Sequence, residues 1–253
     1  MLTLDSWGVP TWGDYDNDGN LDLFVPQDKR RCRLFRNQGD RNFVEITTGT
    51  LVNEPTGGTC AAWADHDNDG DLDLFMARFG TPGNRSYENL NSGNGNHWLK
   101  VRLRGTASNS HAVGAKVTAV AAIQGKVARQ MRVITANQAC QELEAHFGLG
   151  NATKTSQLRI QWPSGETQLL RNVTADQILT LWEPPALKAA VQPDGACTLN
   201  IRAEPNRGWQ IQASSDLTVW QTLTTVTNTT LAFQYTDTTA VGVASRFYRV
   251  GSE

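Results

Sequence analysis

The sequence predicts an all-β protein made of several small units. Three observations support this fold class. An acidic turn occurs twice within the first 76 residues, short β-prone runs separated by turn residues recur along the chain, and no long segment shows the 3.6-residue period of an amphipathic helix. The chain has 253 residues, which exceeds a typical single domain of about 100–150 residues, so two or three units are expected.

The acidic turn is an internal repeat with an offset of 51 residues. The first copy runs from Trp12 to Phe24 and the second from Trp63 to Phe75, and ten of the thirteen aligned positions are identical. Residue 6 of each turn is a glycine, Gly19 or Gly70, which supplies the backbone freedom for a tight loop.

Aspartates at positions 1, 3, 5 and 9 of each turn suit a hard cation that takes about six to eight oxygen ligands. We expect two calcium sites, because four close carboxylates would repel one another without a cation. The alternative is an ordinary acidic turn without metal. The expected ligands are the side chains of Asp14, Asp16, Asp18 and Asp22 with the carbonyl of Asn20, and the side chains of Asp65, Asp67, Asp69 and Asp73 with the carbonyl of Asp71.

The residues after each turn indicate strands rather than helices. A helix–loop–helix calcium site needs a bidentate glutamate at position 12, but Val25 and Met76 stand there. The segments 21–25 and 72–76 are apolar and β-prone, so each loop is expected to join two strands.

The repeats resemble the FG-GAP or VCBS-type repeats of calcium-binding β-propellers. The first copy continues in that manner through 33–37 and 43–47, and the second more weakly through 85–89. The resemblance implies a partial β-propeller of about two blades in residues 1–95. Because propellers close with about four to eight blades, we expect further blades upstream or self-association through open strand edges. The alternative is that the two calcium hairpins pack directly on the next domain.

A second resemblance covers residues 96–184. The segments 96–105, 113–117, 146–150 and 160–165 are similar to the ASPIC/UnbV domain. Strands are expected there at 98–104, 115–123, 126–134, 157–162, 167–171 and 178–182. After Pro184 and Pro185, residues 185–253 more loosely resemble a fibronectin-type-III-like β-sandwich, with strands expected at 197–201, 209–213 and 246–250.

The resemblances imply an extracellular or cell-surface module for calcium-dependent binding or adhesion to a protein or glycan, with no known reaction. The alternative is an accessory region of a larger secreted enzyme whose catalytic part lies upstream. No signal-peptide pattern opens the sequence, so we expect a truncated chain. The net charge of -2 gives no basic stripe for nucleic acid, and no run of 18 apolar residues predicts a membrane span.

Catalytic motifs are absent from the sequence. It contains no Gly-x-Ser-x-Gly elbow, no His-Glu-x-x-His and no phosphate-binding glycine loop. We therefore expect a non-enzyme, with Ser164 in a hairpin turn and His66 at a non-ligand position of the second loop. His146 is expected to be a hydrogen-bonded strand residue. The pairing of the four cysteines (Cys32, Cys60, Cys140 and Cys197) stays open.

Overall fold

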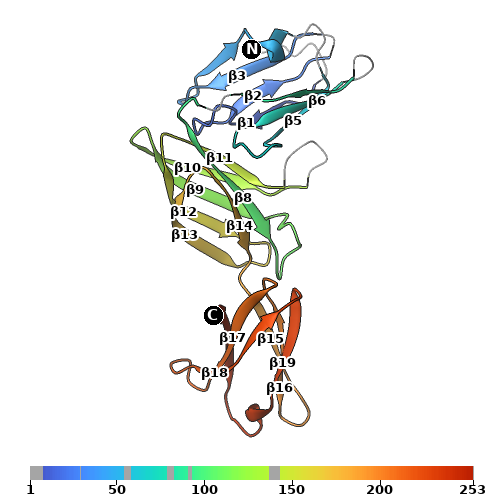
Figure 1. The fold of residues 1–253 in the computed structure, drawn as a ribbon, viewed down its shortest axis with the longest axis vertical. Coiled ribbons are helices and arrows are strands. Elements are labelled where there is room, and N and C mark those ends of the chain that lie inside the picture. Colours follow the sequence, from blue (N-terminus) through green and yellow to red (C-terminus); the bar gives the residue numbers. More distant parts are fainter. Residues whose placement is uncertain are drawn as a thin grey trace. The chain divides into compact units, whose positions relative to one another are not determined.

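A computed structural model describes residues 8–28, 30–53, 58–78, 83–90, 93–136 and 143–252. Within these residues the regular secondary structure is almost entirely β-strand (Figure 1), which confirms the all-β prediction. The chain divides into two compact units. The first unit contains residues 1–102, 113–161 and 169–180, and the second contains residues 103–112, 162–168 and 181–253.

The acidic repeat builds two small sheets in the first unit. Each loop joins the first two strands of an antiparallel meander, as expected, and the two meanders share a core that contains Phe24, Leu34, Trp63, Leu74 and Met76. The four-stranded sheet has the order β1-β2-β3-β4 (Thr11–Gly13, Asp22–Val25, Arg33–Asn37 and Phe43–Ile46). A short helix, α1 (Thr50–Asn53), precedes the three-stranded sheet β5-β6-β7 (Cys60–Ala64, Asp73–Ala77 and Arg85–Tyr87). Neither sheet closes within the described residues, so a propeller of two blades stays a prediction.

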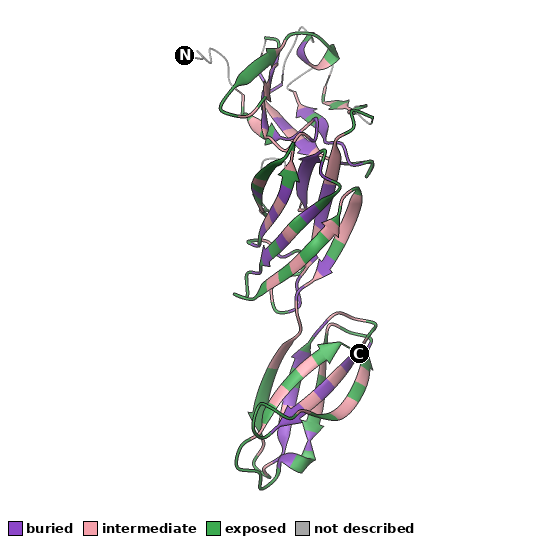
Figure 2. Cartoon of the chain, turned by 90° about the vertical axis from the view of Figure 1, so that its left-hand side faces the viewer, coloured by how far each residue is buried: buried purple, intermediate pink, exposed green. Residues whose placement is uncertain are grey.

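Seven strands follow and form two sheets. The first has the order β10-β9-β12-β13, and the second has the order β11-β8-β14. Strand β11 is buried along its whole length, whereas β9 and β12 alternate between buried and more exposed residues (Figure 2). The bounds are β8 His97–Arg104, β9 Lys116–Ile123, β10 Lys126–Val133, β11 Ala145–Gly150, β12 Lys154–Gln161, β13 Thr167–Thr174 and β14 Gln177–Trp182.

The C-terminal residues form two three-stranded sheets around Leu199, Ile201, Trp209 and Ile211. The sheet orders are β15-β16-β19 and β18-β17-β20. The bounds are β15 Ala186–Val191, β16 Cys197–Arg202, β17 Arg207–Ser214, β18 Gln221–Asn228, β19 Ala232–Asp237, the 3-10 helix η1 Thr238–Ala240 and β20 Phe247–Ser252. The boundaries expected at 95/96 and 184/185 stay predictions. Within the described part of the chain, no helix is long and apolar enough to cross a membrane.

A buried carboxylate organises the second unit just before the C-terminal strands. Glu183 is 2% exposed. Its Oε2 accepts hydrogen bonds from the main-chain N–H groups of Thr106, Ala107 and Ser108 at 2.7–2.8 Å, and its Oε1 accepts from the hydroxyls of Ser108 at 2.7 Å and Ser164 at 2.5 Å. Burial opposes ionisation, but these hydrogen bonds outweigh it and hold the pKa of Glu183 below its usual value.

Candidate calcium site

The two acidic loops have the same backbone conformation. Asn17 and Asn68 have φ values of 58° and 63°, and Gly19 and Gly70 have values of 95° and 97°. These angles lie in the left-handed region, where glycine and asparagine are tolerated best. The repeat in the sequence is therefore a repeat in structure, and the expected role of the glycine at position 6 is confirmed.

The last aspartate of each loop holds the loop to the sheet. Asp22 accepts main-chain N–H groups from Tyr15 at 3.1 Å and from Asn37 at 2.7 Å. Asp73 accepts the equivalent groups from His66 at 3.2 Å and Asn89 at 2.8 Å. A carboxylate oxygen has more than one lone pair, so these bonds orient Asp22 and Asp73 and leave acceptor capacity for an ion.

The first three aspartates of each loop converge. One oxygen of each of Asp14, Asp16 and Asp18 lies within 4.8 Å of the others, and the same holds for Asp65, Asp67 and Asp69. A third group of this kind joins His66, Asp67 and Asp73. His66 Nδ1 lies 2.6 Å from Asp73 Oδ2, a contact that the sequence does not predict.

Buried oxygens in both loops lack hydrogen-bond donors. Asp14 and Asp65 are each 1% exposed, yet among the described residues Asp14 Oδ1 and both carboxylate oxygens of Asp65 accept no hydrogen bond. A buried carboxylate without enough donors is costly, whereas a hard cation takes such oxygens as ligands. The residues present therefore fit a calcium ion in each loop.

The pKa values of several loop carboxylates also indicate that their ionised forms are destabilised. Burial, followed by the charges of Asp18, Asp22 and Asp16, raises the pKa of Asp14 well above its usual value. Burial is also the main cause that raises the pKa of Asp22 to about 7. In the second loop, burial and then Asp69 raise the pKa of Asp71 to about 6. A bound cation would favour the ionised forms and reverse these shifts.

Different positively charged side chains lie beside the two loops. Arg36 follows the first loop on β3, is 41% exposed in its side chain, and places Nε 2.6 Å from Asp16 Oδ2. Asn37 and Asn89 occupy equivalent positions in the two repeats, because their side-chain amides donate to the equivalent carbonyls of Leu21 and Leu72 and the strand registers match. The residue that corresponds to Arg36 in the second repeat is therefore Glu88, which is exposed.

The second loop instead meets a buried lysine. Lys100, on β8, is fully buried, and its Nζ donates to the main-chain oxygen of Asp65 at 2.8 Å. The same Nζ lies 3.4 Å from Asp65 Oδ2 and 3.3 Å from Asn68 Oδ1, and it is 3.4 Å from Glu144 Oε2. No local pattern in the sequence marks Lys100, because its partners are more than 30 residues away.

Strands of the same unit press closely on both loops. Gly148 on β11 permits this approach, since a Cβ there would lie 2.1 Å from Asp14 Oδ2. His146 Nε2 lies 2.9 Å from the oxygen of Gly70, and the same histidine stacks on Trp98. His146 is therefore a buried, hydrogen-bonded strand residue, as expected, and burial is the main cause that lowers its pKa to about 4.

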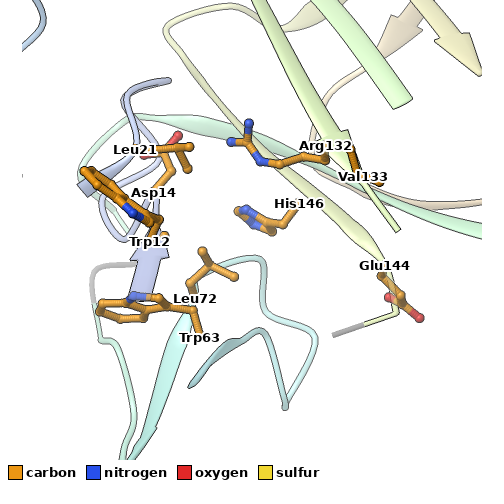
Figure 3. A pocket seen from close by; sticks show the side chains of 10 residues that line it. Trp12, Asp14, Leu21, Trp63, Leu72, Arg132, Val133, Glu144 and His146 are labelled. Atoms are coloured by element: carbon orange, nitrogen blue, oxygen red, sulfur yellow. The ribbon is translucent and has the colours of Figure 1, made fainter. Parts of the chain in front are cut away.

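A cavity of about 90 Å³ lies between the loops and these strands. Figure 3 shows Arg132 from β10 and His146 from β11 directed toward Asp14 of the first loop. Burial lowers the pKa of Arg132, and the charge of Asp14 opposes this effect. Ser164 lies in the turn between β12 and β13, as expected, and its hydroxyl donates to Glu183 Oε1. Cys32 carries a buried free thiol, and Cys140 lies outside the described residues.

Comparison with known proteins confirms the resemblances to FG-GAP-type repeats and to the ASPIC/UnbV domain, whereas the fibronectin-type-III-like resemblance stays a prediction. Residues 14–76 match the FG-GAP-like repeat family, and residues 105–188 match the ASPIC and UnbV family. Cartilage acidic protein 1 of Mus musculus is 32% identical over 187 residues, which are 67% of this chain and 27% of that protein. Its counterpart in Xenopus tropicalis is 32% identical over 169 residues, 60% of this chain and 25% of that protein. The chain thus spans about a quarter of these relatives.

A solved structure gives a weak match. It is described as a Ca2+-stabilized adhesin that helps an Antarctic bacterium reach out and bind ice, and the alignment covers 98% of this chain and 73% of that one. The sequence identity is 9% and the TM-score is 0.19. A score this low carries no argument about fold or function.

Proposed function

We propose that this protein is a non-catalytic extracellular module that binds one calcium ion in each acidic loop and thereby holds its N-terminal sheets in a binding-competent form. The observation that supports this proposal most directly is the convergence of three carboxylates in each loop around buried oxygens without donors. The FG-GAP-like and ASPIC/UnbV matches are in keeping with a module of this class.

The proposed ligands divide into two roles. Asp14, Asp16 and Asp18 would supply side-chain oxygens to the first ion, with the carbonyl of Asn20, while Asp22 both anchors the loop and offers an oxygen. The second ion would be held in the same way by Asp65, Asp67, Asp69, the carbonyl of Asp71 and Asp73. When bound, calcium would add positive charge to that of Arg36 beside Asp16 and Lys100 beside Asp65, and its role would be structural.

The proposed binding partner is a protein or glycan at the cell surface. Residues 66–69 of the second loop are exposed, whereas the first loop is mostly covered, so the second loop is the one that a partner can reach. The alternative is a binding region of a larger secreted enzyme. Further propeller blades or self-association would cover the exposed side chains of Trp12, Phe43 and Phe75.

Calcium titration calorimetry of the metal-stripped protein tests the proposal. We expect two ions with dissociation constants of about 0.1–1 mM, the range of extracellular calcium modules. Asp16→Ala and Asp67→Ala should each remove one ion, and His66→Ala should remove neither. Absence of binding heat in the folded wild-type protein would show that the loops are ordinary acidic turns that bind no calcium.

A further inference from the structure

We propose that the two calcium loops are coupled, so that an ion in either loop raises the affinity of the other, and that the side-chain amide of Asn17 carries this coupling. The inference rests on the proposed calcium function and adds a regulatory link between its two sites. Asn17 lies in the first loop, is 1% exposed, and reaches across to the second loop. Its Nδ2 donates to the main-chain oxygen of Gly70 at 3.0 Å and to Asp71 Oδ1 at 2.8 Å.

The first loop determines where Asn17 lies. The residue stands between two proposed ligands, Asp16 and Asp18, and has a left-handed φ of 58°. Its main-chain oxygen accepts the N–H of Gly150 at 2.8 Å. An ion that orders Asp16 and Asp18 therefore restricts the peptide that carries Asn17, and it does so from both sides.

Asn17 contacts the part of the second loop that must be ordered for an ion to bind. Gly70 and Asp71 are positions 6 and 7, and the carbonyl of Asp71 is a proposed ligand. The oxygen of Gly70 also faces His146 Nε2 at 2.9 Å, so two side chains fix this peptide. If the first ion orders Asn17, the second ion binds a loop that is already partly ordered. Binding that orders a shared element gives positive cooperativity without any new contact between the ions.

The second loop contains a matched control. Asn68 has the same loop position as Asn17 and a similar φ of 63°, but its Oδ1 faces Lys100 Nζ at 3.3 Å and not the first loop. Glycine adopts such angles without strain. Asn17→Gly and Asn68→Gly therefore remove the two amides without disturbing the backbone, and only the first should affect coupling.

The coupling factor can be measured by calorimetry with calcium alone. Asp67→Ala isolates the first loop and Asp16→Ala isolates the second. The product of the two wild-type association constants, divided by the product of these single-site constants, is the coupling factor. We expect on the order of tenfold, within the usual allosteric range. In the Asn17→Gly background the factor should fall to about one, whereas Asn68→Gly should retain it even if the affinity of the second loop changes.

The outcomes separate this inference from the proposed function. Two bound ions with a coupling factor of one in the wild-type protein would overturn the inference and leave the calcium sites intact, whereas no binding at all would overturn both. An unchanged factor in Asn17→Gly, or an equal loss in Asn68→Gly, would show that Asn17 is not the carrier. If Asn17→Gly does not fold, Asn17→Asp removes the same donors and sets a carboxylate against Asp71, so its factor should be one or less.

Discussion

Asp14 of the first acidic loop and Glu183 of the second unit are both buried carboxylates, yet their surroundings shift their pKa values in opposite directions. From the described residues Asp14 accepts one hydrogen bond, from the N–H of Gly19 at 3.0 Å, and it lies among other carboxylates. Glu183 accepts five hydrogen bonds from N–H and O–H donors. The pKa of Asp14 is raised, first by burial, whereas hydrogen bonds lower that of Glu183.

This comparison shows that burial of a carboxylate does not by itself indicate a cation site. The number of hydrogen-bond donors around the carboxylate decides whether its anion is stable without a cation. A carboxylate that receives enough N–H and O–H groups is stable as an anion, as Glu183 is, and needs nothing more. A cluster of carboxylates that receives too few donors must have its negative charge neutralised, either by protons or by a bound cation. The carboxylates of the two loops form clusters of this kind.

Removal of the Glu183 carboxylate should lower the unfolding free energy more than any other change proposed here. Glu183→Ala leaves the N–H groups of Thr106, Ala107 and Ser108 without their acceptor, which should cost about 3 kcal/mol or more of unfolding free energy. Glu183→Gln should cost less, because its amide can still accept from the N–H groups and donate to the two serine hydroxyls. Urea unfolding monitors both variants. Equal losses in calcium and in chelator are expected, and a calcium-dependent loss would contradict the comparison.

Asp14→Asn should show the opposite dependence on calcium. In chelator the substitution removes an unpaired buried charge, so the unfolding free energy should rise. In calcium it removes a ligand, so much of the linkage contribution, about 2.7 kcal/mol per site at a hundredfold excess over the dissociation constant, should be lost. Thermal melts in both conditions measure the change. The same sign in chelator and in calcium would refute the assignment of Asp14 as a ligand.

The two kinds of carboxylate should also differ in their dependence on pH. For Asp22 the folded pKa of about 7 exceeds the unfolded value, so the calcium-free fold binds more protons and loses stability as pH rises from about 4 to 7. Asp22→Asn should flatten this slope. For Glu183 the folded pKa is lowered, so its contribution is present above the usual carboxyl pKa and is lost as pH falls below it.

Chemical unfolding in chelator between pH 4 and pH 8 checks these slopes. The deficit of Glu183→Gln should stay constant from pH 8 to pH 5 and shrink near pH 4. A calcium-free wild-type protein that is most stable at pH 8 would argue that the loop carboxylates are already well satisfied.

The smallest effects concern the exposed charges beside each loop. Arg36→Gln should strengthen calcium binding by the first loop a few-fold, because the guanidinium competes for Asp16. Glu88→Gln should weaken binding by the second loop to a similar extent. Exposed pairs contribute about 0.2–1 kcal/mol, and both shifts should diminish at high salt. Calorimetry measures the calcium affinity of each loop separately when Arg36→Gln is combined with Asp67→Ala and Glu88→Gln is combined with Asp16→Ala. Shifts in the same direction for both would contradict the charge difference between the loops.

The sequence predicts the local parts of this structure well and the long-range parts poorly. Loop conformation follows from short-range chemistry, so the left-handed Gly19 and Gly70 and the strands that follow them were predictable. Lys100 was not, because its role depends on which strand packs behind the second loop. Strand β11 was expected only as the strand that carries His146 and was given no range, since its two glycines carry no β-propensity and are explained by the loop that they approach.

Asp14 and Asp65 keep buried oxygens without donors among the described residues and are proposed to hold cations with the other loop aspartates, whereas the buried Glu183 is satisfied by hydrogen bonds and should hold none. A crystal structure determined in calcium, with anomalous difference maps, tests this most directly. We expect one anomalous peak in each loop, at about 2.3–2.6 Å from the carboxylate oxygens, and none beside Glu183. Empty loops with unchanged aspartate positions in saturating calcium, or a peak at Glu183, would contradict it.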